Sequence, residues 1–85
     1  MLFETKELHC TIEVLRLLTK GKTKYSLMFR KTKVSHTTLQ RVLKELNSKS
    51  FIRKYDIGHM NVDYEIAPKG KDLLELLNKL KILIK

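Results

Sequence analysis

The sequence predicts a small α+β domain in which a three-helix core carries a β-hairpin and a further helix. Three observations support this fold class. Apolar residues recur at helical spacing in three successive segments between residues 6 and 48. Two short runs rich in β-branched and aromatic residues follow, with a glycine-containing turn between them. A leucine-rich segment with helical spacing comes last. A length of 85 residues predicts a single domain over residues 1–85.

The first three helices are predicted from apolar stripes and from residues that can cap them. A stripe that includes Leu8, Ile12 and Leu15 predicts a helix over residues 6–19, which Gly21 ends. Thr23 is expected to cap a short second helix over residues 24–32. After a short turn, Ser35 is placed to cap a third helix that runs to residue 47 or 48. The apolar stripe of this third helix consists of Val34, Leu39, Val42, Leu43 and Leu46.

A β-hairpin and a long helix are predicted for the second half of the chain. Residues 52–57 and 62–66 are expected to form two strands, because the second run alternates apolar and charged residues. Pro68 is suited to the first turn of a helix that runs to residue 84. The apolar arc of this helix is too wide for one small domain to cover, so residues 68–85 are interpreted as a dimerisation helix. An ordinary last helix packed wholly on its own core is the alternative. The expected interface residues are Leu73, Leu76, Leu77, Leu80, Leu83 and Ile84.

Positive charge is concentrated in the middle of the chain. The net charge is +9, yet residues 20–54 hold eleven basic residues against the single acidic Glu45, which gives +10 for this segment alone and −1 for the remainder. A field of this kind favours a polyanion as the partner. The alternative, a lysine-rich surface that only keeps the protein in solution, would spread the charge more evenly.

Two stretches carry a family resemblance. Residues 25–54 read Y-S-L-M-F-R-K-T-K-V-S-H-T-T-L-Q-R-V-L-K-E-L-N-S-K-S-F-I-R-K, and they place a short helix, a turn, a serine cap, an apolar-spaced helix and a strand in succession. Residues 64–74, Y-E-I-A-P-K-G-K-D-L-L, are similar to the strand-to-helix exit of MarR-, PadR- and TrmB-like proteins. The chain therefore resembles a small winged helix-turn-helix DNA-binding protein, and its size and lysine content resemble regulators from archaea and their viruses or plasmids. This resemblance implies a homodimeric transcription regulator that binds double-stranded DNA at a pseudo-palindromic site.

Roles for individual side chains follow from this resemblance. Residues near the start of a recognition helix reach base edges in the major groove, and flanking cations contact phosphates. Thr38 is expected either to hold the helix start or to contact DNA. The residues expected to read bases are His36, Thr37, Gln40 and Arg41. The residues expected to contact phosphates are Lys24, Arg30, Lys31, Lys33, Lys44, Arg53 and Lys54. The tip of the hairpin, or wing, lacks Arg and Lys, so the wing is expected to contribute through His59 and Asn61, through the basic residues at its root, or only slightly.

Other functional classes find little support in the sequence. The three histidines lie on separate predicted elements, so no metal site or cofactor is expected. No catalytic motif is recognisable, so an enzyme is not expected. Tyr25, Tyr55 and Tyr64 are interpreted as core edges, and Cys10 as a packed thiol. The lack of a long apolar run predicts a cytoplasmic, nucleoid-associated protein without a membrane partner. Two alternatives stay open: an architectural protein that coats DNA without sequence preference, and a winged helix that binds an acidic protein.

Overall fold

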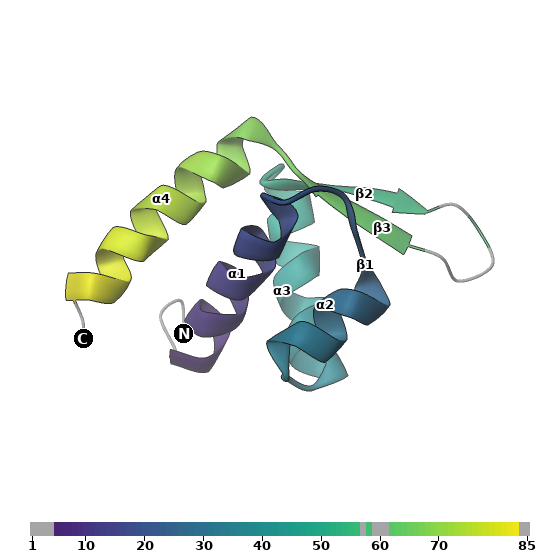
Figure 1. The fold of residues 1–85 in the computed structure, drawn as a ribbon, viewed down its shortest axis with the longest axis horizontal. Helices are drawn as coiled ribbons and strands as arrows, with labels where there is room; N and C mark the ends of the chain where they lie inside the picture. Colours follow the sequence, from purple (N-terminus) through teal and green to yellow (C-terminus); the bar gives the residue numbers. More distant parts are fainter. Residues whose placement is uncertain (1–4, 57, 59–61, 84–85) are drawn as a thin grey trace.

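The computed structural model describes residues 5–56, 58 and 62–83 and confirms the predicted α+β fold class. Helices and strands follow the order expected, with one additional short strand (Figure 1). The elements are α1 (Thr5–Leu18), β1 (Thr23–Lys24), α2 (Tyr25–Thr32), α3 (His36–Ser48), β2 (Ile52–Asp56), β3 (Val62–Ile66) and α4 (Pro68–Leu83).

Helix α1 lies at the centre of the fold and contacts α2, α3 and α4. The apolar stripe predicted for α1 is the one that is buried, with Ile12 and Leu15 fully inaccessible to solvent. The stripe of α3 faces the same interior, where Leu39 and Leu43 meet Met28 of α2. Because burial of each such side chain contributes about 1.5–3 kcal/mol, these stripes fix which face of each helix points outward.

The turn between α2 and α3 is only three residues long and is held at both ends. Lys33 takes the left-handed conformation (φ 57°, ψ 30°) and thereby ends α2 without the glycine that often occupies such a position. At the start of α3, the hydroxyl oxygen of Ser35 accepts a hydrogen bond from the backbone N–H of Thr38 at 3.2 Å, as the sequence predicted. The Ser35 hydroxyl in turn donates to Oγ1 of Thr38 at 3.0 Å, which supports the structural role considered for Thr38.

The expected cap of α2 by Thr23 is wrong. Lys24 is the N-cap residue, and its side chain makes no capping hydrogen bond. Thr23 belongs to β1, where it pairs with Tyr64 and donates its hydroxyl to the backbone oxygen of Gly21 at 3.0 Å. The sheet is antiparallel with the order β1-β3-β2. A two-residue strand has no periodicity of its own and exists here because β3 offers a free edge.

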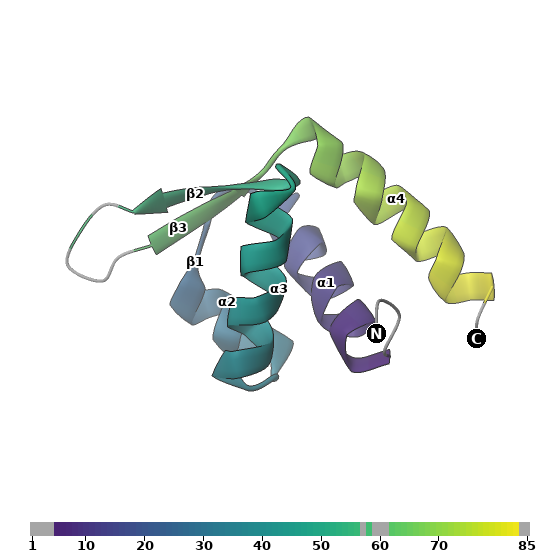
Figure 2. The ribbon, with the colours of Figure 1, turned by 180° about the vertical axis from the view of Figure 1, so that it is seen from behind.

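The hairpin of β2 and β3 projects away from the helices, whereas α4 returns beside α1 (Figures 1 and 2). Ile52 pairs with Ile66 at the base of the hairpin, and β2 ends at Asp56; Ile57, which was predicted to belong to this strand, lies outside the described residues. The backbone oxygen of Phe51 accepts the N–H of Ala67 at 3.0 Å and so fixes the point at which α4 begins.

Helix α4 is only partly covered by the rest of the chain. Leu73, Leu74 and Leu77 pack against the core. By contrast, Leu76 is 63% exposed, Ile82 75% and Leu83 81%. Apolar side chains of α4 therefore remain exposed beyond those that pack on the core.

Candidate nucleic-acid interface

Helix α3 presents a polar face to solvent. Burial of its apolar stripe against α1 and α2 leaves the opposite side exposed, and Figure 2 shows α3 on the near side of the molecule. Four polar side chains at steps of four, four and three residues lie along this exposed side: His36, Gln40, Lys44 and Asn47. Thr37 is also exposed, at the first turn. The candidate base-reading residues other than Arg41 thus share one end of one exposed face.

His36 is held by two aromatic residues of α2. Its ring stacks on Phe29 with centroids 3.7 Å apart and an angle of 9° between the ring planes. The hydroxyl of Tyr25 lies 2.9 Å from Nδ1 of His36, within hydrogen-bonding distance. Burial raises the pKa of the Tyr25 phenol above its ordinary value, and the neighbouring Gln40 side chain acts in the opposite direction. Sequence reasoning placed Tyr25 at a core edge and missed these contacts, because no sequence pattern relates residues eleven positions apart.

A hollow of 600 Å³ connects the exposed face of α3 to the hairpin. Gln40, Lys44 and Asn47 line it from α3, Tyr25 lines it from α2, and Lys54 lines it from β2. The recognition face predicted for α3 is therefore continuous with the hairpin.

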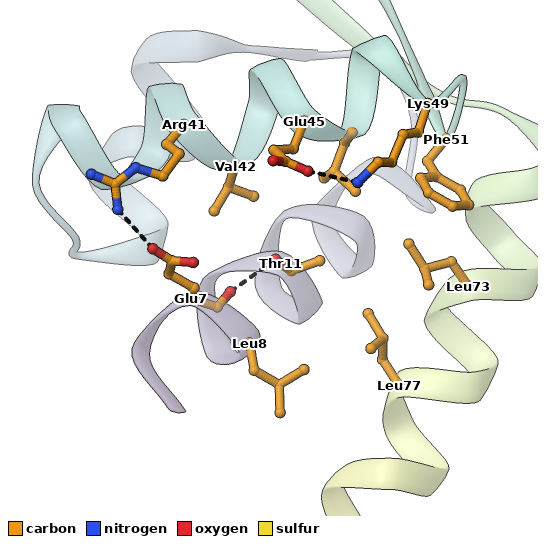
Figure 3. A pocket seen from close by; sticks show the side chains of 11 residues that line it. Glu7, Leu8, Thr11, Arg41, Val42, Glu45, Lys49, Phe51, Leu73 and Leu77 are labelled. Atoms are coloured by element: carbon orange, nitrogen blue, oxygen red, sulfur yellow. Dashed lines mark hydrogen bonds and ion pairs between the residues drawn. The ribbon is translucent and has the colours of Figure 1, made fainter. Parts of the chain in front are cut away.

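Arg41 points in another direction. Its guanidinium forms an ion pair with the carboxylate of Glu7 in α1 at 2.7 Å (Figure 3). With Val42 and residues of α4, these side chains line a groove of 640 Å³ between α1, α3 and α4. Arg41 thus lies on the flank of α3 that faces α1, apart from Gln40. The spacing of residues 40 and 41 could not show which of the two would meet a carboxylate from another helix.

Most of the predicted phosphate-contacting cations lie on the surface without an acidic partner in the part of the chain that the structure describes. Arg53 is the exception, since it lies 3.7 Å from the carboxylate of Glu65 across the hairpin. Within residues 5–56, 58 and 62–83, no acidic oxygen lies within 4 Å of the charged groups of the other six, which are Lys24, Arg30, Lys31, Lys33, Lys44 and Lys54.

A further cation lies against the outer part of the hairpin. Nζ of Lys22 lies 4.3 Å from the centre of the Tyr55 ring in β2, a cation–π contact that extends the basic surface onto the hairpin. The hydroxyl of Tyr55 donates to the Glu65 carboxylate at 3.2 Å. His59 and Asn61, the predicted contacts at the wing tip, lie outside the described residues.

The family to which this arrangement belongs is decided by comparison with known sequences. The family model for HxlR-like helix-turn-helix proteins matches residues 9–85. The chain belongs to the HxlR-like helix-turn-helix family. This assignment confirms the predicted helix-turn-helix; it does not confirm the expected likeness to MarR-, PadR- and TrmB-like proteins or the archaeal type. No curated protein sequence matches this HxlR-like chain significantly.

Solved structures share the fold of this HxlR-like protein. The transcriptional regulator BldR from Sulfolobus solfataricus superposes with a TM-score of 0.75 at 19% identity, over 88% of this chain and 56% of its own. A transcriptional regulator from Clostridium thermocellum gives 0.74 at 21% identity, over 91% of this chain and 82% of its own. A homodimeric winged helix-turn-helix DNA-binding domain from Mycobacterium bovis gives 0.62 at 20% identity, over 88% and 67%. The chain thus spans little more than half the length of BldR.

Two structural features are absent from the described residues. None of their helices is long and apolar enough to cross a membrane. Among the same residues, no three His, Cys, Asp or Glu side chains gather closely enough to hold a metal ion.

Proposed function

We propose that the protein is a transcription regulator that binds double-stranded DNA in a sequence-specific manner as a homodimer, with α3 in the major groove. The observation that carries this proposal is the set of six exposed cations on α2 and its flanks, α3 and β2 that have no acidic partner among the described residues. Ion pairs elsewhere on the surface, such as Lys49 with Glu45 at 2.8 Å, show that cations are paired where acids are near. The unpaired set leaves its charge available to phosphates.

Residue roles within this proposal follow from position on α3. His36, Thr37 and Gln40 lie near the N-terminal end of the exposed face, from which side chains reach base edges. Gln40 has the amide that pairs with adenine through two hydrogen bonds. Arg41 can read guanine only after its guanidinium leaves Glu7, so its contribution is conditional on that exchange.

The cations contact phosphates on either side of α3 in this proposal. Lys24, Arg30, Lys31 and Lys33 belong to α2 and its flanks, whereas Lys44 and Lys54 lie at α3 and the wing. Arg53 contributes less as long as it is shared with Glu65. The wing tip residues His59 and Asn61 are proposed to contact the adjacent backbone or minor groove.

Dimer formation through α4 is the second part of the proposal. Leu76, Leu80 and Leu83 lie at steps of four and three on one side of the helix, and both Leu76 and Leu83 are exposed. Exposed leucines in a row favour a partner of the same kind. Leu73 and Leu77 pack on their own core and support the helix from within, and Ile84 of the predicted interface lies outside the described residues. The Mycobacterium bovis neighbour is a homodimer, which agrees with a paired arrangement.

The DNA-binding proposal is tested by selection of bound duplexes from a random pool, followed by affinity measurements over a range of salt concentrations. An inverted repeat bound roughly a thousandfold more tightly than random DNA is the expected result. Lys31→Ala is expected to weaken all duplexes alike and to reduce the salt slope by about 2, because each protomer of the dimer loses one phosphate contact. Lys79→Ala, in α4, serves as the matched control and leaves the slope unchanged. Equal affinity for every duplex would instead favour an architectural protein.

The dimer proposal is tested by light scattering of two α4 variants. Leu83→Glu places a charge in the exposed row without touching the core, so it is expected to give a folded monomer. Lys79→Glu changes the charge elsewhere on the same helix and is expected to stay dimeric. If Leu83→Glu stays dimeric, the dimer interface does not lie on α4.

A further inference from the structure

The contact between Tyr25 and His36 has a consequence for what α3 offers to a base. A neutral imidazole carries one N–H, and the hydrogen-bond partner of one ring nitrogen determines which nitrogen carries that proton. In this structure the phenolic hydroxyl of Tyr25 lies 2.9 Å from Nδ1 of His36. The direction of that hydrogen bond therefore decides whether the remaining nitrogen, Nε2, is a donor or an acceptor.

The relative strengths of the two groups as donor and acceptor set this direction. Burial raises the pKa of the Tyr25 phenol above its ordinary value, so the phenol keeps its proton. A phenolic O–H is a stronger hydrogen-bond donor than a neutral imidazole N–H, and an imidazole nitrogen is a stronger acceptor than a phenolic oxygen, so Tyr25 directs its O–H to His36. Nδ1 of His36 then accepts, and the imidazole proton resides on Nε2.

The ring that carries this proton is held in one plane. The Phe29 ring stacks on the His36 ring with centroids 3.7 Å apart. The Tyr25 ring lies nearly parallel to the His36 ring, with centroids 5.8 Å apart and an angle of 12° between the ring planes. His36 is nevertheless exposed and is the first residue of α3. Its orientation is therefore set before any DNA arrives.

We propose that Tyr25 is a positioning residue for base recognition, whose hydroxyl holds His36 in the Nε2–H form so that α3 selects a base with an acceptor on its major-groove edge. This inference rests on the proposed function. Guanine, adenine and thymine each carry an acceptor there, whereas cytosine offers only the N4 amino donor. The base that faces His36 is therefore any of the first three, and cytosine is disfavoured.

The tautomer is tested first in the protein without DNA. Long-range ¹H–¹⁵N NMR spectra at pH 8, where imidazole side chains are predominantly neutral, report which ring nitrogen carries the proton. His36→Gln identifies the His36 signals by their loss. We expect the Nε2–H form in the parent protein and a mixture of both forms in Tyr25→Phe, which keeps the ring and removes only the hydroxyl. An Nδ1–H form in the parent, or an unchanged spectrum in Tyr25→Phe, overturns the proposal.

Base preference is tested next, with duplexes that vary one position at a time within the selected site. We expect discrimination against cytosine at one position, reduced roughly three- to tenfold in Tyr25→Phe, the range that loss of one hydrogen bond gives. His36→Gln should change preference at the same position, and adding Tyr25→Phe to it should have no further effect. Tyr55→Phe removes the hydroxyl that donates to Glu65 on the wing and is the matched control, expected to leave this position unaffected.

The outcomes separate this inference from the proposed function. A parent protein that binds every duplex alike contradicts both. A selected site whose preferences are unchanged by Tyr25→Phe, or a preference for cytosine opposite His36, overturns the inference alone. Thermal unfolding of each variant confirms that the fold is retained.

Discussion

Gly70 marks the closest approach between α4 and the segment that leads into β2, and its replacement by alanine gives a sharp test of the fold. A Cβ atom at this position would lie 2.1 Å from the backbone oxygen of Phe51 and 2.8 Å from Cγ1 of Ile66. The first distance falls 1.3 Å short of the 3.4 Å at which ordinary van der Waals contact begins. Because the Phe51 oxygen also accepts the N–H of Ala67, it cannot move away without loss of that hydrogen bond.

Two opposing contributions set the magnitude of the effect. Alanine is about 1 kcal/mol better than glycine in a helix, which would stabilise α4. Overpacking costs about 1–3 kcal/mol and more when backbone is involved, and the overlap here is with backbone. We therefore expect Gly70→Ala to lower the free energy of unfolding by about 2 kcal/mol, which corresponds to a fall in melting temperature of roughly 8–16 °C for a domain of this size.

The measurement is urea or thermal unfolding followed by circular dichroism, at one protein concentration because dimer formation would add to stability. Lys71→Ala is the control: it exchanges one good helix former for another at the adjacent exposed residue and should stay within about 0.5 kcal/mol of the parent. If Gly70→Ala proves as stable as the parent, the overlap with the Phe51 backbone costs no more than the gain in helix propensity. That result would refute the close contact between α4 and Phe51 as described.

Three further predictions concern single side chains. Ser35→Ala should lower the free energy of unfolding by about 1 kcal/mol through loss of the α3 cap, while Ser35→Asn, measured by the same urea titration, should retain most of it. Glu7→Gln should change the free energy of unfolding by less than about 1 kcal/mol, since its ion pair with Arg41 is exposed. The same variant should bind the selected site more tightly if the freed guanidinium of Arg41 reads a base. Unchanged affinity would show that Arg41 does not read a base. Burial raises the pKa of the Cys10 thiol to about 11, so the native protein should resist thiol reagents at pH 8 until urea unfolds it. The stability of the protein should fall as the pH rises from about 9 towards 11, because over this range the thiol ionises in the unfolded chain but not in the folded one. Rapid labelling of the native protein would contradict this prediction.

Local patterns in the sequence predicted most of the fold. The apolar stripes of α1 and α3, the Ser35 cap and the hairpin depend on residues close together in the chain, and each was placed to within one or two residues. Strand β1 escaped prediction because its existence depends on pairing with β3, some forty residues later. The expected capping role of Thr23 failed for the same reason.

The candidate site was harder to predict than the fold. Periodicity correctly placed His36 and Gln40 on the exposed face of α3, but it could not reveal Tyr25 beside them or Glu7 beside Arg41. Both contacts join residues on different helices. For α4, the pattern showed an apolar arc that was too wide, and the structure shows which leucines face inward and which lie exposed.

The six cations that have no acidic partner among the described residues have a cost in the free protein. Like charges repel one another, so a basic surface that attracts DNA also opposes the compact state at low ionic strength. Added salt should relieve that repulsion and stabilise the fold over the same range in which it weakens DNA binding. Bound DNA would provide the same relief through its phosphates, so the protein should be most resistant to unfolding when its basic face is covered.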